Sequence, residues 1–386
     1  MTPAILGAFG PAQLACIRSW SDRGYRPLFI HLTAAPARAR LLVRSVHAYL
    51  QVDPARLDED ATITRIAEFL ARYDASGVVA VDYRRIDWLW SVRDRLPASV
   101  ELWVPARATL DLLQSKQRQT ELAQRVGLDV APTWHVGADG AGHVPDEAFP
   151  LVLRPDDPHA IVPAFKVHRV DSTRALAEFV ATFERLDKPL LAQSFIDGQN
   201  LVVHGVRAPA SGQCLHAAFL VERMFEGVCL TIRRIALPDG LEAACRAFVE
   251  AADMAGIYHF EFRHCPASGK YVFLDFNGRL GGTTGKALRC GFDEPGLLVD
   301  AFRGGEFHIA TLAASGRITA TNKLAMVKVL LCALNAKLTV FDYPDVALPR
   351  RLADLLPGFL TWRDEIWVPR HWRSSFAYLA QMVATR

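Results

Sequence analysis

The chain has 386 residues, 51% hydrophobic and 22% charged, an ordinary globular composition with room for two or three domains. Its net charge of +3 is small and no dense Lys/Arg block occurs, which argues against nucleic-acid or membrane-surface binding. The seven cysteines are scattered without a C-x-x-C pair, and neither a leader peptide nor an apolar run long enough to span a membrane is apparent, so we expect a cytoplasmic protein.

The first 110 residues alternate apolar strands with helices. Strands are expected at 3–9, 27–32 and 77–82, and helices at 11–23, 62–73 and 84–96. The run GVVAVD at 77–82 is typical of a strand inside a parallel sheet, so this unit should be a small doubly wound α/β domain. It has no G-x-G-x-x-G motif, and His31 rather than an acid closes the second strand, which disfavours an NAD-dependent enzyme.

The middle of the chain mixes hairpins with helices and is expected to be α+β. Ser115 is a suitable N-cap for a helix over 116–126 that ends at Gly127. Strands are expected at 133–136, 150–155, 165–170, 189–195, 200–207, 215–222 and 228–234, and helices at 172–185 and 241–255. The tail holds a helix or strand at 324–334 and a Trp/Arg-rich stretch at 362–372, which we interpret as aromatics capping a domain rather than a partner surface.

The stretch from 256 to 285 carries the clearest chemistry. Alternating residues predict strands at 258–264 and 271–277, joined by a turn at 266–269. By that alternation one face of the first strand carries His259, Glu261 and Arg263, and one face of the second carries Phe273, Asp275 and Asn277. In a hairpin Glu261, Asp275 and Asn277 can converge, and two carboxylates with an amide oxygen suit Mg²⁺ held together with substrate phosphates.

Arg279 and a glycine-rich segment, Gly281-Gly282-Thr283-Thr284, follow this hairpin. A guanidinium beside a metal is a natural clamp for a phosphoryl group or an oxyanion. A single acid or amide at a strand end often only caps a turn, but the whole series in this order favours a site. A zinc site of His259, Glu261 and His264 is disfavoured because His264 lies on the opposite strand face.

The order of five motifs resembles the ATP-grasp superfamily. They are SK…TELA from Ser115, GL…PT from Gly127, PLVLRP from Pro150, LLAQSFIDG from Leu190, and Glu261…Asp275-x-Asn277-x-Arg279. Together they cover roughly residues 110–290. The resemblance implies a doubly wound pre-ATP-grasp domain at 1–110 and a two-lobed grasp with its small lobe at 111–195. The large lobe, with the metal site, would span 196–315, followed by a segment of unidentified role at 316–386.

The resemblance also implies roles for individual residues. Phosphate contacts would come from Lys116, Arg154 and Lys166, and the adenine pocket from the hinge residues Gln193, Ser194, Phe195 and Ile196. Asn200 would meet the ribose, while Glu261, Asp275 and Asn277 would hold Mg²⁺ or Mn²⁺. Lys116 and Arg279 would be the catalytic residues. Three features depart from the family pattern: Arg154 replaces a lysine, Asn200 replaces a frequent glutamate, and the segment 156–164 has no glycine where a glycine-rich flap is common.

The activity implied by the resemblance is ATP-dependent ligation of a carboxylate to an amine through an acyl-phosphate, with release of ADP and phosphate. No side-chain nucleophile is expected, the partners would be small molecules rather than nucleic acid or membrane, and a homodimer is common in similar folds. Three alternatives stay open. They are another ATP-grasp chemistry (carboxylase, thiol ligase or kinase), a nucleotide-binding protein that has lost catalysis, and an NAD-dependent enzyme built on the N-terminal unit.

Overall fold

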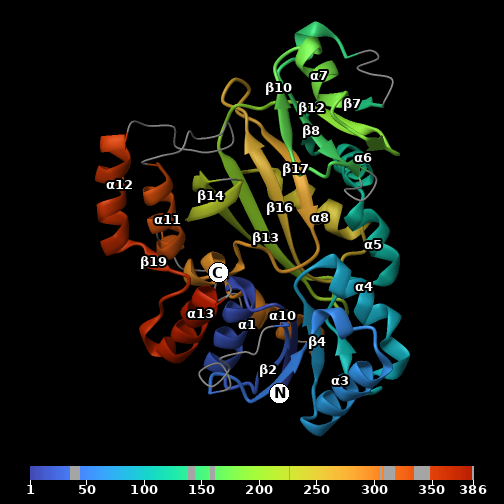
Figure 1. Cartoon of the computed structure of the whole chain (residues 1–386), viewed down its shortest axis with the longest axis vertical. Helices are drawn as coiled ribbons and strands as arrows, with labels where there is room; N and C mark the ends of the chain where they lie inside the picture. The colour runs from blue at the N-terminus through green and yellow to red at the C-terminus, as the bar shows by residue number, and fades with distance from the viewer. Residues whose placement is uncertain are drawn as a thin grey trace.

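The chain folds into three parts, seen in a computed structural model that describes residues 1–34, 44–137, 144–156, 161–225, 227–304, 307, 318–333 and 348–384. In Figure 1 the N-terminal domain (blue) lies at the bottom, a long sheet stands in the middle, and a small lobe (green) sits at the top right. The C-terminal helices (red) run along the left side of the long sheet.

The N-terminal domain is a doubly wound parallel sheet. Its strands are β1 (Pro3–Gly7), β2 (Leu28–Leu32), β3 (Ala48–Val52), β4 (Gly77–Ala80) and β5 (Glu101–Leu102). Its helices are α1 (Pro11–Asp22), α3 (Asp60–Arg72) and α4 (Tyr83–Ser91), with 3-10 turns η1 (Pro54–Arg56) and η2 (Arg93–Arg95). In the strand order β3-β2-β1-β4-β5, β2 and β3 are added on one side of β1, and β4 and β5 on the other. The chain therefore changes the side of the sheet on which it adds strands between β3 and β4, and β1 and β4 lie next to each other at this change of order. The loops after these two strands therefore border the crevice where such sheets bind ligands.

The small lobe is an antiparallel sheet with its own core. Its strands are β7 (Thr133–Val136), β8 (Leu151–Pro155), β10 (His168–Val170) and β12 (Leu190–Ser194), in the order β10-β8-β12-β7. Around it lie α7 (Thr173–Val180), η3 (Asp146–Ala148) and the pair β9 (Ile161–Val162) and β11 (Arg185–Leu186). Two helices, α5 (Arg107–Gln114) and α6 (Lys116–Arg125), lead into it. Leu151, Leu153, Leu176 and Leu190 are fully buried between α7 and the sheet.

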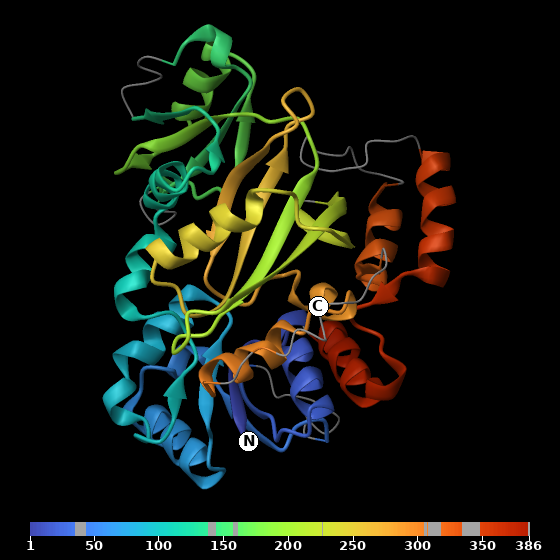
Figure 2. The same cartoon turned by 180° about the vertical axis from the view of Figure 1, so that it is seen from behind.

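The large lobe is an eight-stranded sheet. Its strands are β6 (Asp129–Val130), β13 (Asn200–Arg207), β14 (Cys214–Phe225), β15 (Val228–Ile235), β16 (Gly256–His264), β17 (Tyr271–Asn277), β18 (Thr319–Thr321) and β19 (Arg363–Asp364). They are ordered β19-β18-β15-β14-β13-β16-β17-β6. Helix α8 (Leu241–Ala251) covers one face (Figure 2), where its Phe248 packs on Phe260, Phe273 and Phe276. Helices α9 (Thr284–Arg289) and α10 (Glu294–Phe302) join the other side of the sheet to α1.

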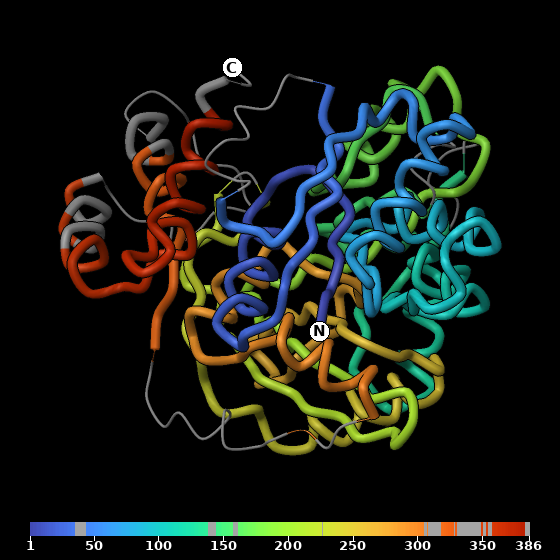
Figure 3. The backbone as a smooth tube through the Cα atoms, turned by 90° about the horizontal axis from the view of Figure 1, so that it is seen from below, coloured from blue at the N-terminus to red at the C-terminus, as the bar shows by residue number. Residues whose placement is uncertain are grey.

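The C-terminal segment extends this sheet and then returns to the N-terminal domain. Besides β18 and β19 it contains α11 (Lys323–Ala333), α12 (Leu348–Thr361), η6 (Pro369–His371) and α13 (Trp372–Ala384). Arg18 of α1 is only 4% exposed. Its guanidinium donates to the carbonyl oxygens of Glu365 and Ile366 and to the hydroxyls of Ser374 and Ser375. Viewed from below, the red helices lie beside α1, on the side of the domain away from α3 and α4 (Figure 3).

Two features of the tail refine the sequence analysis. Residues 324–333 of the stretch 324–334, predicted as a helix or a strand, lie on α11, and residue 334 falls outside the described residues. Trp367 and Trp372 are 41% and 47% exposed and touch the exposed Phe376 edge-on, so these aromatics are only partly packed. In the described ranges, no helix combines the length and the apolarity needed to cross a bilayer.

Candidate active site

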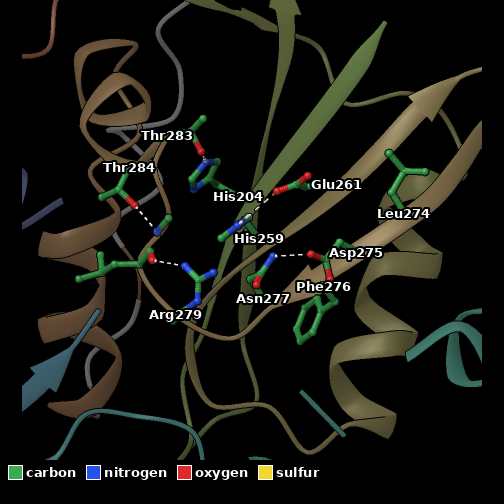
Figure 4. Close-up of polar contacts among 12 residues, drawn as sticks. His204, His259, Glu261, Leu274, Asp275, Phe276, Asn277, Arg279, Thr283 and Thr284 are labelled. Carbon is green, nitrogen blue, oxygen red and sulfur yellow. Dashed lines mark hydrogen bonds and ion pairs between the residues drawn. The ribbon is translucent and has the colours of Figure 1, made fainter. Parts of the chain in front are cut away.

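The β16–β17 hairpin brings the three predicted metal-binding residues together. The two strands pair antiparallel, with Glu261 opposite Asp275 and His259 opposite Asn277. Cross-strand partners point to the same face of a sheet, so the two acids and the amide share one surface. Figure 4 shows them side by side, with the Asn277 amide nitrogen donating to Oδ2 of Asp275 at 3.2 Å. This bond leaves the amide oxygen of Asn277 as an acceptor for another group.

One detail of the predicted hairpin is wrong. The pairing shifts after Glu261, where Phe262 faces Phe273 and Leu274 is left as the extra residue of β17. This bulge turns Phe273 onto the opposite face from Asp275, into the aromatic core beneath α8. Strict alternation predicted Phe273 on the same strand face as Asp275 and Asn277. The prediction failed because a bulge cannot be recognised from the alternating pattern of residues.

Lys116 lies against this acid pair from the small-lobe side. It is the first residue of α6, after the N-cap Ser115, and its Nζ forms an ion pair with Oδ1 of Asp275. Desolvation alone would raise the pKa of Asp275, but the positive charges of Lys116 and Arg154 outweigh it and hold that pKa below its usual range. Asp275 is therefore ionised at neutral pH.

Glu261 shows the opposite shift. Desolvation and the neighbouring Asp275 charge raise its pKa, against the charges of Lys116, Lys166 and Arg279. Two facing carboxylates that repel each other in this way fit a divalent cation, whose charge would relieve the repulsion. In the described part of the chain, no group of three or more His, Cys, Asp or Glu side chains is arranged to hold a metal. A cation here would therefore need Asn277 and ligand oxygens to complete its shell.

Arg154 and Gln193 connect the small lobe to β17. Arg154 Nη1 donates to the carbonyl oxygen of Leu274 at 2.9 Å, and Nη2 donates to Gln193 Oε1. Gln193 is fixed in turn by its Nε2, which donates to the Thr133 hydroxyl at 3.0 Å. The carbonyl that Arg154 reaches belongs to the bulge residue, so the predicted phosphate ligand also joins the two lobes.

The predicted hinge lies between the two sheets, because β12 ends at Ser194 and β13 begins at Asn200. The centre of the Phe195 ring lies close to two guanidinium groups, 4.5 Å from that of Arg169 and 5.4 Å from that of Arg263. Arg263 also donates to the Ile196 carbonyl at 3.1 Å and to the Asn200 amide oxygen at 2.8 Å. Asn200 is buried, so its side chain helps to build the hinge.

The remaining predicted phosphate ligand, Lys166, lies in the small lobe after the predicted flap segment. Lys166 is exposed between β9 and β10, close enough for its charge to act on Glu261. Of the glycine-free segment 156–164, residues 157–160 fall outside the described residues.

Arg279 is held from the N-terminal domain by Tyr83, a residue that the sequence analysis missed. The guanidinium lies 5.4 Å from the centre of the Tyr83 ring, and the Tyr83 hydroxyl accepts the Gly278 N–H at 2.9 Å. A Cβ at 278 would lie 2.8 Å from the Leu113 side chain, which would have to move to admit it. Tyr83 follows β4 at the reversal of strand order, and that position in the sequence was the available signal.

A buried polar chain lies under the glycine-rich loop and was also missed. His204 Nδ1 contacts Glu294 Oε2 at 3.1 Å, and its Nε2 contacts the Thr283 hydroxyl at 2.8 Å. Thr284 donates to the same Glu294 oxygen and accepts the Gly281 N–H. The hydroxyl–imidazole–carboxylate order resembles a hydrolase triad. However, His204 and Glu294 are fully buried and Thr283 is only 6% exposed, so a substrate cannot easily reach them. These hydrogen-bonded side chains therefore support the loop.

No protein-family profile and no curated protein matches this sequence, whereas several solved structures match the fold. The L-amino acid ligase of Bacillus licheniformis matches with a TM-score of 0.58 at 16% identity, covering 78% of this chain and 74% of that one. The N5-carboxyaminoimidazole ribonucleotide synthetase of Thermus thermophilus matches at 0.60 and 17%, covering 79% of both chains. The biotin carboxylase domain of the Hydrogenobacter thermophilus 2-oxoglutarate carboxylase, solved with MgADP and bicarbonate, matches at 0.60 and 14%, covering 79% and 70%. All three are ATP-grasp enzymes. The chain therefore has the ATP-grasp fold, with a doubly wound domain preceding the two-lobed grasp.

Proposed function

We propose that this protein is an ATP- and Mg²⁺-dependent ligase that joins a carboxylate to an amine through an acyl-phosphate. One observation carries the proposal: Glu261 and Asp275 face each other across paired strands, beside Asn277, with Lys116 on Asp275. Phosphoryl transfer needs positioning and charge stabilisation more than a nucleophilic side chain, and this set of residues supplies both.

Nucleotide binding would fall to the residues of the two lobes that lie near the acid pair. Lys116, at the start of α6, and Lys166 of the small lobe both act electrostatically on Glu261 and would carry charges for the phosphates. Gln193 to Ile196 would border the adenine, and Asn200 would stand near the ribose. Arg154 would contribute its charge while its guanidinium keeps the lobes joined.

The residues fit a hard divalent cation. Glu261, Asp275 and Asn277 would hold Mg²⁺, or Mn²⁺, through oxygen atoms. When bound there, the cation neutralises the phosphate oxygens of ATP.

The chemistry then runs in two steps. A substrate carboxylate oxygen attacks the γ-phosphorus of ATP, the bond to the β-phosphate oxygen breaks, and ADP leaves. The amine nitrogen adds to the acyl carbon, the oxyanion collapses, phosphate leaves with the C–O bond electrons, and the amine proton passes to solvent. Arg279 would hold the carboxylate and then the oxyanion, since its fork suits both.

A second candidate is ATP-dependent carboxylation, favoured by the likeness to a carboxylase domain solved with bicarbonate. It would use the same phosphate and metal residues. The two differ in the acid that is phosphorylated and in the mass of the product. For either function we propose small-molecule substrates and a homodimeric protein.

The test is ATP turnover with Mg²⁺ against pools of carboxylic acids and bicarbonate, each with and without amines. Ligation predicts ADP and phosphate that depend on the carboxylate, and an amide mass that appears only with amine. Asp275→Asn should abolish turnover, whereas Asp129→Asn, an exposed acid on the neighbouring strand β6, should keep it. Absence of ATP binding would contradict the proposal.

A further inference from the structure

The glycine-rich loop rests on an ion pair contributed by the C-terminal segment. Lys286 of α9 and Glu365, just after β19, lie 2.9 Å apart with side chains that are 3% and 1% exposed. Asn322 also donates to Glu365, and a Cβ at Gly285 would come within 2.8 Å of its other oxygen. Removing two charges from water costs free energy, so an ion pair buried this deeply points to a specific role at this position.

The same lysine fixes one peptide group of the loop. Lys286 Nζ donates to the Gly282 carbonyl oxygen at 3.1 Å. In a trans peptide the C=O and the following N–H point in opposite directions. Drawing the Gly282 carbonyl toward the buried pair therefore turns the Thr283 N–H away from it.

That N–H is an unused donor in the described part of the chain. Among the described residues, neither the Gly282 nor the Thr283 N–H has a hydrogen-bond acceptor. Gly282 is exposed, and a Cβ there would meet no atom within 4 Å. The loop is thus open at Gly282, and the N–H groups of Gly282 and Thr283 are unused donors there.

The second buried pair holds the rest of the loop. His204 and Glu294 fix the Thr283 hydroxyl and, through Thr284, the Gly281 N–H. Figure 4 shows Thr283, Thr284 and Arg279 on one side of His204 and His259, with Glu261 and Asp275 on the other. The loop therefore depends on both buried pairs, and the orientation of the Gly282–Thr283 peptide depends on Lys286.

We propose that Lys286 and Glu365 are positioning residues that set the Thr283 N–H as an oxyanion donor beside Arg279. Preorganised backbone donors act on charge that develops in the transition state, so their orientation affects the chemical step more than substrate binding. The C-terminal segment thereby completes the active site through Glu365. This inference rests on the proposed ligase function.

The test is the double variant Lys286→Met with Glu365→Leu, which leaves no unpaired buried charge. We expect kcat for carboxylate-dependent ADP release to fall about 10- to 100-fold, while the Kd for ATP and the thermal midpoint stay close to wild type. Lys270→Met is the matched control, because it breaks an exposed ion pair with Asp129 at the far end of β17. Glu365→Gln, which keeps the side-chain shape, is the second variant should the double variant not fold.

Hydrogen exchange gives a readout independent of turnover. The amides of Gly281 and Thr284 are hydrogen-bonded within the loop and should exchange faster in the double variant but not in Lys270→Met. Unchanged exchange, or faster exchange with wild-type kcat, would overturn the inference. No turnover by the wild-type protein in any substrate pool would instead refute the proposed function, and the inference would fall with it.

Discussion

Glu261 and Asp275 are two carboxylates on one surface with opposite electrostatic surroundings. Asp275 is kept ionised by Lys116 and Arg154, whereas desolvation and the Asp275 charge raise the pKa of Glu261. A group whose pKa is raised on folding contributes stability below its unfolded pKa and loses it as the pH rises through the folded value. At neutral pH an ionised Glu261 therefore lowers the stability of the metal-free protein.

The variant Glu261→Gln separates stability from function. Because it removes a charge repelled by Asp275, the metal-free protein at pH 7 should unfold at the wild-type temperature or higher, with carboxylate-dependent turnover lost. Thermal unfolding with and without Mg²⁺, beside ADP release, checks this. Glu121→Gln, an exposed acid on α6, is the control. A lower midpoint with turnover retained would contradict the prediction.

Arg279 is expected to act as a planar fork. Arg279→Lys keeps one charge but loses the bidentate geometry and the stacking on Tyr83. We expect kcat to fall on the order of 100-fold, a loss comparable to that of one oxyanion donor. Steady-state kinetics at saturating ATP measure it, with the exposed Arg174→Lys on α7 as control. Wild-type rates would remove Arg279 from the mechanism.

At the scale of elements, the bulge in β17 supplies one contact between the lobes. It places Leu274 outside the regular ladder, and the Leu274 carbonyl accepts from Arg154 of β8. The contact thus needs both the charged Arg154 side chain on β8 and the bulge that exposes the Leu274 carbonyl on β17. We therefore expect movement of the small lobe to be coupled to the strand that carries Asp275.

Arg154→Lys tests this coupling. An ammonium group cannot reach both Leu274 and Gln193 with the same geometry, and hydrogen bonds to charged groups contribute about 1.5–3 kcal/mol. We expect a loss of that order in the free energy of unfolding by denaturant, together with weaker ATP binding. Arg125→Lys, exposed at the end of α6, should change neither. Full stability and affinity in Arg154→Lys would show that the contact carries no coupling.

The sequence predicted what periodicity and local chemistry can encode. Alternation located β17 and β13 with the observed bounds, and Ser115 caps α6 as expected. The half-exposed β3 and the two-residue β5 were missed because neither carries a clear apolar pattern. The face of Phe273 was wrong because of the bulge.

Contacts between distant segments left no signal in the sequence. The glycine-rich loop was noticed, but nothing local indicates that His204, Glu294 and Glu365 lie beneath it. They are brought there by packing among β13, α10 and the C-terminal segment. The roles assigned to the individual site residues stay predictions.

At the scale of the whole molecule, every part contributes to one region. The N-terminal domain supplies Tyr83, the small lobe Arg154, the large lobe the acid pair, and the C-terminal segment Glu365. We therefore expect a change that destabilises any one of these four parts to disturb the geometry of the candidate active site.

The N-terminal domain should make stability depend on pH through His31. This imidazole is fully buried, stacks on Phe29 and bonds the Tyr49 hydroxyl, and burial lowers its pKa from 6.5 to about 4. The unfolded chain then binds more protons than the folded one between these values. Stability is full above about pH 6.5 and falls by up to about 3 kcal/mol toward pH 4.

Denaturant unfolding across this pH range measures the effect of His31. His31→Gln should flatten the slope, and the exposed His47→Gln should leave it unchanged. Equal slopes in wild type and His31→Gln would assign the acid sensitivity to other groups.

The buried Arg18 has a consequence for the order of events during synthesis. Its hydroxyl partner Ser374 is made 356 residues after it. At about 5–20 residues per second, this interval lasts on the order of 20–70 s. Throughout that time the guanidinium must remain hydrated, so this side of α1 stays open to water and to other chains. The helix that covers this side of the first domain is therefore made long after the domain itself.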